Sequence, residues 1–391
     1  MSEVVIVEAV RSAVGKRRGG LAHVLAPDLF SEVLAGLVER SGIESSVVGQ
    51  VTGGCVSQVG QQAGNVTRSA WLAAGLSEAT GASTIHAQCG SSQQAFTLAY
   101  GLVASGVTDV AVAGGVESMD QVPMTSSIVP ELGSSKTARY EEHYEITTQF
   151  EAADRIAEKW GFSRDALEEF AVLSQERAAS AVAAGRFADQ IVPVEATVRD
   201  DAGQVTGSRT IAVDEGPRAT TREGLAALRV NQTDRPGALH TAGTSSQISD
   251  GASALLLTTE ERAAQLGVRP RARVVDSLLI GNDPVLMLTG PIPATQAILD
   301  RNGLTIDDID VIEINEAFAS VVLAWQHELT ADLSRVNVNG GAIALGHPLG
   351  ATGGVLLTKA LNELERVKGR YALVTMCVGG GMGTGTLIER L

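Results

Sequence analysis

Short runs of β-branched and other apolar residues recur along the chain, and they are the feature that most constrains its fold. The runs are V-V-I-V at 4–7, V-A-V-A-G-G at 110–115, V-I-E-I-N at 311–315, V-N-V-N-G-G at 336–341 and A-L-V-T-M at 372–376. Runs of this length predict buried strands. The Ala/Leu-rich stretches 28–40 and 93–104 predict helices between them. Alternating strands and helices indicate a layered α/β protein.

The two ends of the chain resemble each other at a separation of roughly 260 residues, as the parts of a duplicated unit would. V-T-G-G-C-V at 51–56 matches V-I-E-I-N-E at 311–316. T-I-H-A-Q-C-G at 84–90 matches V-N-V-N-G-G-A at 336–342, and D-V-A-V-A-G-G at 109–115 matches Y-A-L-V-T-M-C at 371–377. The identities are few, so chance similarity between buried strands stays an alternative. We interpret the pattern as a duplication.

Between these similar regions the composition shifts toward charged helices and polar turns. E-A-A-D-R-I-A-E-K-W at 151–160 is typical of such a helix, and R-D-D-A-G-Q-V-T-G at 199–207 has the residues of a hairpin turn. We therefore predict an N-terminal half over 1–117, completed by about 251–270, an inserted loop domain over 118–250 and a C-terminal half over 271–391. An insertion in this place is suited to hold or cover a substrate.

The chain is strongly acidic, and its charge argues against two kinds of partner. A formal net charge of −15 repels the phosphates of nucleic acids and anionic membrane surfaces. An anionic ligand therefore requires a local group of cations or helix N-termini. No apolar run is long enough for a membrane helix, and the N-terminus lacks the pattern of a targeting segment.

The cysteines indicate a reducing compartment. Cys55, Cys89 and Cys377 cannot all pair with one another, and no C-x-x-C spacing indicates a zinc or redox site. We therefore expect free thiols, a cytoplasmic location and no metal site.

Cys89 is the strongest candidate nucleophile. It lies in H-A-Q-C-G-S-S-Q-Q-A, directly after a predicted strand and directly before a predicted helix. The free N–H groups and the dipole of a helix N-terminus favour a thiolate, which lowers the pKa of a thiol from its ordinary value of roughly 8.5. A small buried hydrophobe is the alternative for any single cysteine, and it is our interpretation of Cys55.

Three further candidates follow or end predicted strands. His347 lies in N-G-G-A-I-A-L-G-H-P-L-G, on a turn specified by glycine and proline, and the absence of G-K-[ST] excludes a P-loop. Cys377 opens C-V-G-G-G-M-G-T-G, whose glycines let backbone N–H groups approach a ligand, as an oxyanion site requires. Asn315, in N-E-A-F-A, is a candidate helix N-cap when taken alone. The alternative for His347 is a structural histidine, and the alternative for the glycine run after Cys377 is a hinge.

Taken together, these motifs closely resemble the thiolase family. N-E-A-F-A, G-G-A-I-A-L-G-H-P-x-G and C-x-G-G-G-M-G occur in the family's order, with C-G-S before a helix upstream. A-G-T-S-S-Q-I-S-D-G-A-S at 242–253 is similar to the family's A-G-N-A-S-x-x-N-D-G-A, so the resemblance covers nearly the whole chain. It implies a duplicated five-layer α/β/α/β/α fold with an inserted loop domain. It also implies an enzyme that moves acyl groups to and from coenzyme A, as a homodimer or homotetramer.

The resemblance implies a role for each candidate residue. Cys89 becomes acylated, His347 takes its proton, and Cys377 deprotonates the α-carbon of acetyl-CoA in condensation or protonates the leaving enolate in cleavage. One oxyanion site is implied at His347 with a water held by Asn315, and another at the backbone N–H groups of Cys89 and Gly379. Coenzyme A is a co-substrate, and no bound cofactor is implied.

The family's coenzyme A contacts fall on two groups of residues. They are Arg218, Ala219 and Thr220 in P-R-A-T-T of the loop domain, and Ser246, Ala317 and Phe318 beside the pantetheine arm. An arginine near a phosphate supplies the local positive charge that this acidic chain needs. The alternative interpretation of Arg218 is a solvated surface arginine.

Departures from the family pattern concern the acyl pocket. Where short-chain thiolases have an H-M-G segment, this chain has Thr148, Gln149 and Phe150. Ser92 replaces the last glycine of C-G-S-G, and T-S-S replaces N-A-S before Gln247. These features resemble degradative actinobacterial thiolases of steroid side-chain breakdown. We therefore predict cleavage of a 3-ketoacyl-CoA to acetyl-CoA or propionyl-CoA and a shortened acyl-CoA.

Four alternatives remain. An acetoacetyl-CoA thiolase working in the condensing direction shares every motif. A ketoacyl synthase would have a second histidine in place of Cys377. A non-catalytic protein that binds coenzyme A or lipid would be expected to lack the nucleophile or the base. A cysteine hydrolase explains neither Cys377 nor the duplication.

Overall fold

The structure, a computed structural model, describes residues 3–199 and 204–391. The strands are β1 Val4–Arg11, β2 Gly15–Lys16, β3 Gln50–Gly54, β4 Gly81–Ile85, β5 Val110–Ser118, β6 Val194–Arg199, β7 Val205–Ile211, β8 Ser249–Thr259, β9 Ala272–Gly281, β10 Val311–Ile314, β11 Tyr371–Val378 and β12 Met382–Arg390. The helices are α1 Ala26–Ser41, α2 Val66–Ala73, α3 Ser91–Ala104, α4 Ala138–Glu141, α5 Gln149–Trp160, α6 Arg164–Ala183, α7 Arg222–Ala226, α8 Glu260–Leu266, α9 Pro291–Asn302, α10 Ala319–Leu329, α11 Ala342–Leu345 and α12 Thr352–Val367.

The strand order repeats on either side of the contact between β1 and β9. The main sheet runs β10-β11-β12-β9-β1-β8-β5-β3-β4. In the first half β3 is parallel to β4 and β5, and β5, β8 and β1 pair antiparallel in turn. In the second half β10 is parallel to β11, and β11, β12 and β9 pair antiparallel in turn. The similarity between the two ends of the sequence is therefore a duplication of the fold.

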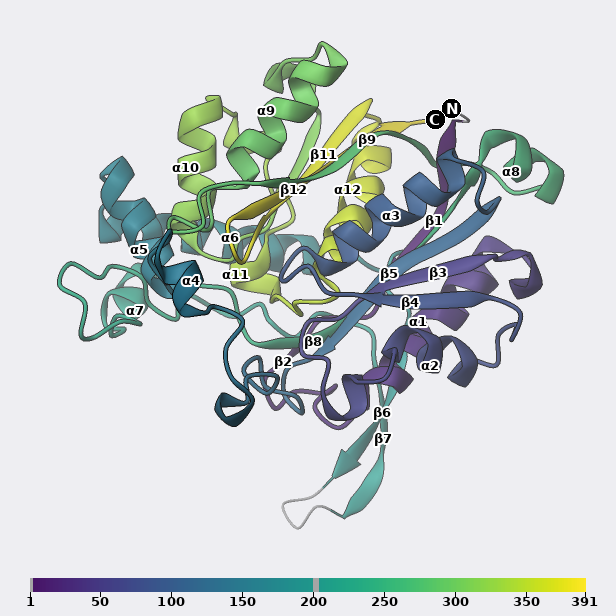
Figure 1. Ribbon diagram of the computed structural model, residues 1–391, viewed down its shortest axis with the longest axis horizontal. Coiled ribbons are helices and arrows are strands. Elements are labelled where there is room, and N and C mark those ends of the chain that lie inside the picture. The colour runs from purple at the N-terminus through teal and green to yellow at the C-terminus, as the bar shows by residue number, and fades with distance from the viewer. Residues whose placement is uncertain (1–2, 200–203) are drawn as a thin grey trace.

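Helices cover both half-sheets, so the core has five layers. α1 and α2 cover the outer face of the first half-sheet, and α9 and α10 cover that of the second. α3 and α12 lie between the half-sheets (Figure 1). Phe30 of α1, Phe96 of α3, Leu357 of α12 and Trp325 of α10 are fully buried in these layers. This is the predicted duplicated α/β/α/β/α core.

One of the five predicted strands is absent. The others and both predicted helices are present, but V-N-V-N-G-G at 336–341 forms only an isolated bridge between Val336 and Ile312. The chain then turns, with φ 45° at Asn337 and 76° at Gly340. The Asn337 side chain accepts from Ile314 N at 2.9 Å and donates to Ile314 O at 2.8 Å. A side-chain amide thus takes the place of the expected strand, which hydrophobic periodicity does not reveal.

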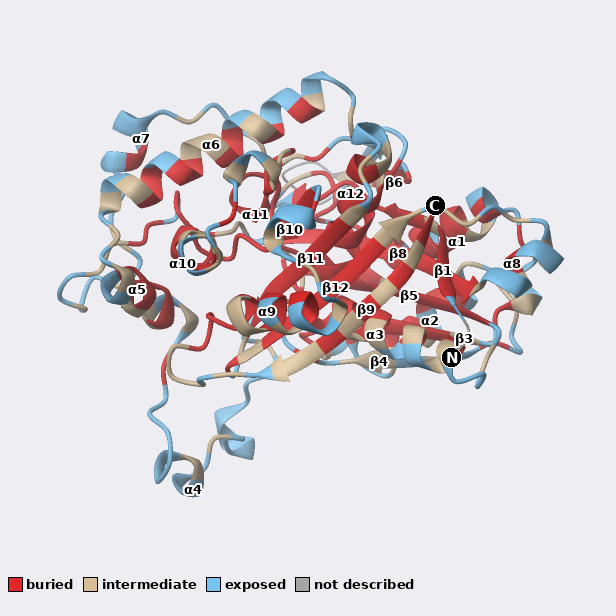
Figure 2. Ribbon diagram, turned by 90° about the horizontal axis from the view of Figure 1, so that it is seen from above, coloured by how far each residue is buried: buried red, intermediate tan, exposed pale blue. Residues whose placement is uncertain are grey.

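The chain leaves the sheet after Ser118 and returns to it at Ser249. The intervening stretch contains α4 to α7 and the hairpin β6–β7, which projects from the body (Figure 1). Figure 2 shows α4 and its surroundings largely exposed, whereas α5 and α6 bury one side. The hairpin predicted at 199–207 is flanked by antiparallel β6 and β7, but its turn at 200–203 lies outside the described residues.

Candidate active site

Cys89 lies at a sharp turn between β4 and α3. Gln88 adopts φ 47°, a left-handed conformation that residues other than glycine rarely take. The Ser91 hydroxyl stabilises this turn, because it donates to Gln88 O at 2.6 Å and accepts from Ala87 N at 3.0 Å. α3 begins at Ser91, so the half-buried Cys89 lies directly before the helix N-terminus, as predicted.

The surroundings of Cys89 keep its thiol protonated. Burial raises the pKa of Cys89 to about 11, and the nearby Glu117 carboxylate acts in the same direction. The backbone N–H groups of Gly379 and of Cys89 itself donate to the sulfur and lower the pKa. The expectation that the helix N-terminus makes a low-pKa thiol was therefore wrong for the free enzyme, because burial outweighs the donors. Cys89 needs a base.

His347 lies on the loop between α11 and α12, and only 3% of it is exposed. Its Nδ1 lies 2.6 Å from the Thr352 hydroxyl, which itself donates to Pro348 O at 2.8 Å. Because that hydroxyl proton is already used, Nδ1–H donates to Thr352 and the unprotonated Nε2 is left as an acceptor. Burial lowers the pKa of His347 to about 4, so the imidazole is neutral at neutral pH. Nε2 is therefore the atom available to accept a proton.

Asn315 follows β10 and is fully buried beside this histidine. Its Nδ2 lies 3.3 Å from His347 Nε2. Its Oδ1 has no hydrogen-bond partner among the described residues. Since buried polar atoms normally have at least one partner, Oδ1 is suited to hold a further donor such as water.

Cys377 is buried near the end of β11, opposite Gly383 of β12. Burial raises its pKa, and so does the charge of the Cys89 sulfur. The two sulfurs are therefore close enough to influence each other. Cys377 also packs in one apolar cluster with Ala317 and Phe318.

The five predicted catalytic residues meet at one edge of the sheet. Parallel strands from both halves reach their carboxyl ends here, which is where ligands bind in open α/β sheets. A hydrogen bond joins Asn315 to His347, and the interactions of Cys89 with Gly379 and Cys377 join the other three residues. Cys89 also packs against the apolar cluster that contains Leu349, two residues after His347.

The first group of predicted coenzyme A residues lies apart from this cluster. Arg218 and Ala219 are exposed and Thr220 is half-buried. Gln175 of α6 holds the segment, because its Oε1 accepts from Arg218 N at 3.0 Å. The three residues line a groove of about 610 Å³ between α6 and residues 217–221.

The second group is brought together with the active-site cluster. Ser246 N donates to Ala317 O at 2.9 Å, and Phe318 forms a backbone bridge with the residue before Ser246. Phe318 packs edge-on against Phe150, with ring centroids 5.6 Å apart. Gln149 begins α5 next to this ring pair. These residues therefore extend the apolar surroundings of the active site toward α5.

Two buried residues near the site were not singled out from the sequence. Thr352 sets the tautomer of His347, and nothing in the sequence distinguishes it from other threonines. Glu117 accepts hydrogen bonds from the loops around the site. The sequence did contain a signal for Glu117, because it lies within the buried run V-A-V-A-G-G-V-E-S at 110–118. A buried carboxylate needs hydrogen-bond donors around it.

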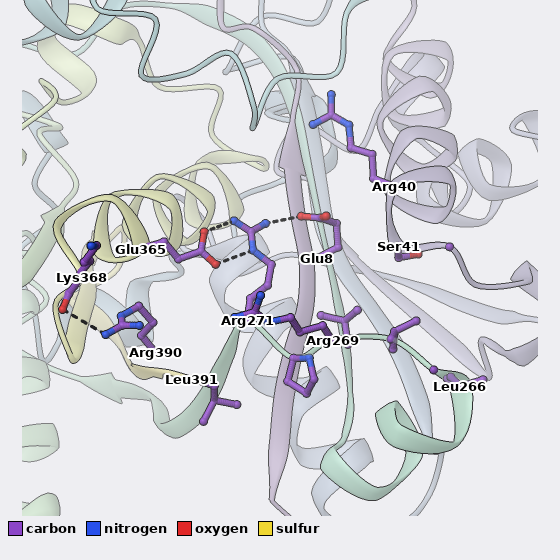
Figure 3. Close-up of a pocket in the computed structure, with 15 residues that line it drawn as sticks. Glu8, Arg40, Ser41, Leu266, Arg269, Arg271, Glu365, Lys368, Arg390 and Leu391 are labelled. Atoms are coloured by element: carbon purple, nitrogen blue, oxygen red, sulfur yellow. Dashed lines mark hydrogen bonds and ion pairs between the residues drawn. The ribbon is translucent and has the colours of Figure 1, made fainter.

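An open cavity of about 840 Å³ lies elsewhere, at the C-terminal residue Leu391 (Figure 3). It is lined by five cations: Arg40, Arg269, Arg271, Lys368 and Arg390. Arg271 pairs with Glu365 at 2.7 Å and with Glu8 (Figure 3). α1, α8 and α12 all end at this cavity, and cations stabilise helix C-termini. We interpret these charges as structural, since no predicted site residue lines the cavity.

Within residues 3–199 and 204–391, no group of three or more His, Cys, Asp or Glu side chains is arranged to hold a metal ion. In the same part of the chain, no helix is long and apolar enough to cross a membrane.

Comparison with known families finds matches over almost the whole chain. The model of the thiolase N-terminal domain matches residues 4–261, and that of the thiolase C-terminal domain matches residues 268–390. The boundary between the two models falls between β8 and β9, close to where the strand order repeats.

Individual relatives align over at least 95% of their length. A steroid 3-ketoacyl-CoA thiolase of Mycobacterium tuberculosis is 47% identical over 399 residues, covering 100% of this chain and 95% of that protein. A β-ketoadipyl-CoA thiolase of Acinetobacter baylyi is 40% identical over 409 residues, covering 100% of both chains. The crystal structure of Bacillus anthracis acetyl-CoA acetyltransferase superposes with a TM-score of 0.89 at 35% identity, covering 100% of this chain and 99% of that one.

Proposed function

Because the chain belongs to the thiolase family, we propose that it uses coenzyme A to cleave a 3-ketoacyl-CoA into acetyl-CoA or propionyl-CoA and a shortened acyl-CoA. The protein is an acyltransferase for which coenzyme A is a substrate. The observations that carry the proposed mechanism are the proximity of Cys89 and Cys377, and the neutral His347, whose loop also contributes Leu349 to the apolar cluster on which Cys89 packs. Cleavage requires one group to carry the acyl chain and another to move the α-proton.

In the first step, His347 Nε2 takes the proton of the Cys89 thiol, and the sulfur attacks the 3-keto carbon. The backbone N–H groups of Cys89 and Gly379 lie beside this sulfur, where they stabilise the oxyanion that forms. The bond between the α-carbon and the keto carbon then breaks, which leaves the acyl group on Cys89.

In the second step, the leaving enolate takes a proton from the Cys377 thiol. Protonated His347 and a water held by Asn315 Oδ1 stabilise the enolate oxygen. The thiol of an incoming coenzyme A then gives its proton to Cys377 and attacks the acyl group. Cys89 leaves as a thiolate and recovers its proton from His347, so every group returns to its initial state.

We propose that residues 118–250 act as the loop domain that binds coenzyme A. The exposed Arg218 supplies positive charge on a chain of net charge −15, next to a groove that Ala219 and Thr220 also line. Ser246 belongs to the same stretch of the chain, and its backbone N–H donates to Ala317 O beside the active-site cluster. The phosphates would then bind at Arg218, and the pantetheine arm would pass Ser246.

The acyl group that we propose is bulky, and steroid side-chain thioesters are the preferred candidates. Gln149 lies where short-chain thiolases have H-M-G, and its Nε2 lies 3.7 Å from Met124 Sδ. The neighbouring Phe150 is 37% exposed and packs on Phe318, which shares an apolar cluster with Cys377. An apolar wall therefore leads from the active site toward the surface at α5. The name of the Mycobacterium tuberculosis relative supports the same substrate class.

A panel of thioesters tests this proposal. The kcat/KM for thiolysis would be measured with acetoacetyl-CoA, with medium-chain and long-chain 3-ketoacyl-CoAs, and with a steroid side-chain 3-keto thioester. We expect the steroid thioester to be cleaved most efficiently, and the Cys89→Ser variant serves as the inactive control. A clear preference for acetoacetyl-CoA would contradict the bulky-substrate proposal.

That outcome would favour the second candidate, an acetoacetyl-CoA thiolase that works in the condensing direction. The close superposition on the Bacillus anthracis acetyl-CoA acetyltransferase supports this alternative. The same residues serve both directions, because deprotonation of acetyl-CoA by Cys377 is the reverse of protonation of the enolate.

We propose that the protein is a homodimer or homotetramer of the cytoplasm. β4 is an edge strand with no fully buried residue, and such an edge is suited to pair with a second copy. The largely exposed hairpin β6–β7 offers a second contact, since two-stranded hairpins are rarely stable alone. The three free cysteines fit a reducing compartment. Light scattering of the purified protein would contradict the assembly if it gave the mass of a monomer.

A further inference from the structure

Glu117 is a buried carboxylate that the proposed mechanism does not use. It lies near the end of β5 and is fully buried. Its Oε2 accepts from Val56 N and Gly350 N, both at 2.9 Å, and its Oε1 accepts from Ser57 N at 3.0 Å and Gln62 Nε2 at 2.9 Å. Burial raises the pKa of Glu117, and the four donors oppose this effect because they stabilise the carboxylate.

These hydrogen bonds join a loop of the first half to a loop of the second. Val56 and Ser57 follow β3, whereas Gly350 lies three residues after His347. The contact is close, because a Cβ atom on Gly350 would lie 2.4 Å from Val116 O and 2.8 Å from Cys55 Cα. Only glycine fits at this position without a shift of the backbone.

The turn that contains Gly350 also orients the imidazole. Ala351 N and Thr352 N donate to Pro348 O at 2.9 Å and 3.0 Å, so residues 348–352 form one hydrogen-bonded unit. The Thr352 hydroxyl accepts from His347 Nδ1 within this unit. A displacement of Gly350 would therefore move the hydroxyl that sets the tautomer and direction of His347.

We propose that Glu117 is a positioning residue, which holds the His347 turn of the second half against the first half so that Nε2 faces Cys89. The inference rests on the proposed roles of His347 and Cys89. The carboxylate acts through Gly350 and touches no reacting atom.

The test is the Glu117→Gln variant. Whichever oxygen becomes an amino group, two of the four N–H donors meet another donor, while the volume is nearly unchanged. We expect kcat for thiolysis to fall about tenfold. This is less than the full loss of a general base, because His347 is displaced and not removed. The KM for coenzyme A should stay within about twofold, since none of the hydrogen bonds of Glu117 goes to a predicted coenzyme A residue.

The rate at which iodoacetamide alkylates Cys89 separates positioning from general loosening. Near neutral pH the protonated thiol predominates and His347 takes its proton as the sulfur attacks, whereas at about pH 10 hydroxide forms the thiolate directly. Glu117→Gln should therefore slow alkylation about tenfold near pH 7 and hardly at all near pH 10. His347→Ala should show the same pattern with a larger loss.

Two further variants complete the test. Glu168→Gln changes another buried carboxylate, which pairs with Arg164 of α6 at 2.6 Å, and should lower the melting temperature without this kinetic pattern. Glu117→Asp keeps the charge and should show the pattern more weakly, and it replaces Glu117→Gln if that variant does not fold. Normal kcat and alkylation near pH 7 in a folded Glu117 variant would overturn the positioning role. Normal alkylation in His347→Ala would instead overturn the proposed base.

Discussion

The two halves of the core share one strand order but contribute different chemistry. In each half a central helix begins at the active site. α3 carries Cys89 directly before its N-terminus, and α12 has Thr352 as its first residue, hydrogen-bonded to His347. In the proposed mechanism the first half thus supplies the acyl carrier, whereas the second supplies the base together with Asn315 and Cys377.

The difference between the halves lies in how burial acts on the two groups. Burial raises the pKa of Cys89 to about 11 and lowers that of His347 to about 4. Both groups are consequently neutral before substrate binds. Their charges appear only during the reaction, when the backbone N–H groups and the substrate can stabilise them.

The Cys377→Ser variant should separate the chemistry of the halves most clearly. The second thiol moves the α-proton, so cleavage should fall about a thousandfold. Transfer of an acetyl group from acetyl-CoA to labelled coenzyme A moves no α-proton and uses Cys377 only to exchange the proton of the coenzyme A thiol, so it should fall far less. Equal losses in the two assays would contradict this division of labour.

The Asn315→Ala variant tests the oxyanion site of the second half. Loss of the water-holding amide should lower kcat for cleavage about a hundredfold, which is typical of removing one oxyanion donor. Steady-state kinetics would show the loss in kcat. An effect confined to the KM for coenzyme A would assign Asn315 to binding.

His240 shows that a low pKa alone does not make a catalytic base. Burial lowers its pKa to about 4, like that of His347, but its Nε2 lies 2.8 Å from the Ser320 hydroxyl, which donates to Ala153 O. The folded state therefore binds fewer protons than the unfolded state between about pH 4 and 6.5, and the stability contributed by neutral His240 falls as the pH falls.

The matching prediction concerns the His240→Gln variant. Its destabilisation relative to the unsubstituted protein should shrink by about 2 kcal/mol between about pH 7 and pH 5, because glutamine does not titrate. Urea unfolding at both pH values measures this difference. A destabilisation independent of pH would show that His240 is not buried in its neutral form.

Ser92 gives the smallest expected effect and tests the contact between the two central helices. Its hydroxyl accepts from Gly354 N at 3.0 Å and so joins the first turns of α3 and α12. Ser92→Ala should lower the free energy of unfolding by about 1 kcal/mol, the typical value of one hydrogen bond. Unchanged stability would mean that the contact contributes nothing to the junction of the halves.

Much of the site could be predicted from the sequence because its residues lie in short motifs at strand ends. Cys89, His347 and Cys377 were predicted in this way, and in the structure the two cysteines lie close enough to influence each other. The pKa of Cys89 was misjudged, because burial depends on residues far away in the chain. The missing strand at Asn337 and the hydrogen bonds of Glu117 also arise between distant segments, where local patterns carry little information.

The central claim is that Cys89 carries the acyl group between the two half-reactions. The protein would be mixed with a 3-ketoacyl-CoA, quenched in acid and digested, and its peptides weighed by mass spectrometry. The account predicts an acyl adduct on the Cys89 peptide, which disappears when coenzyme A is added before quenching. An adduct on Cys377, or turnover with no adduct on Cys89, would contradict it.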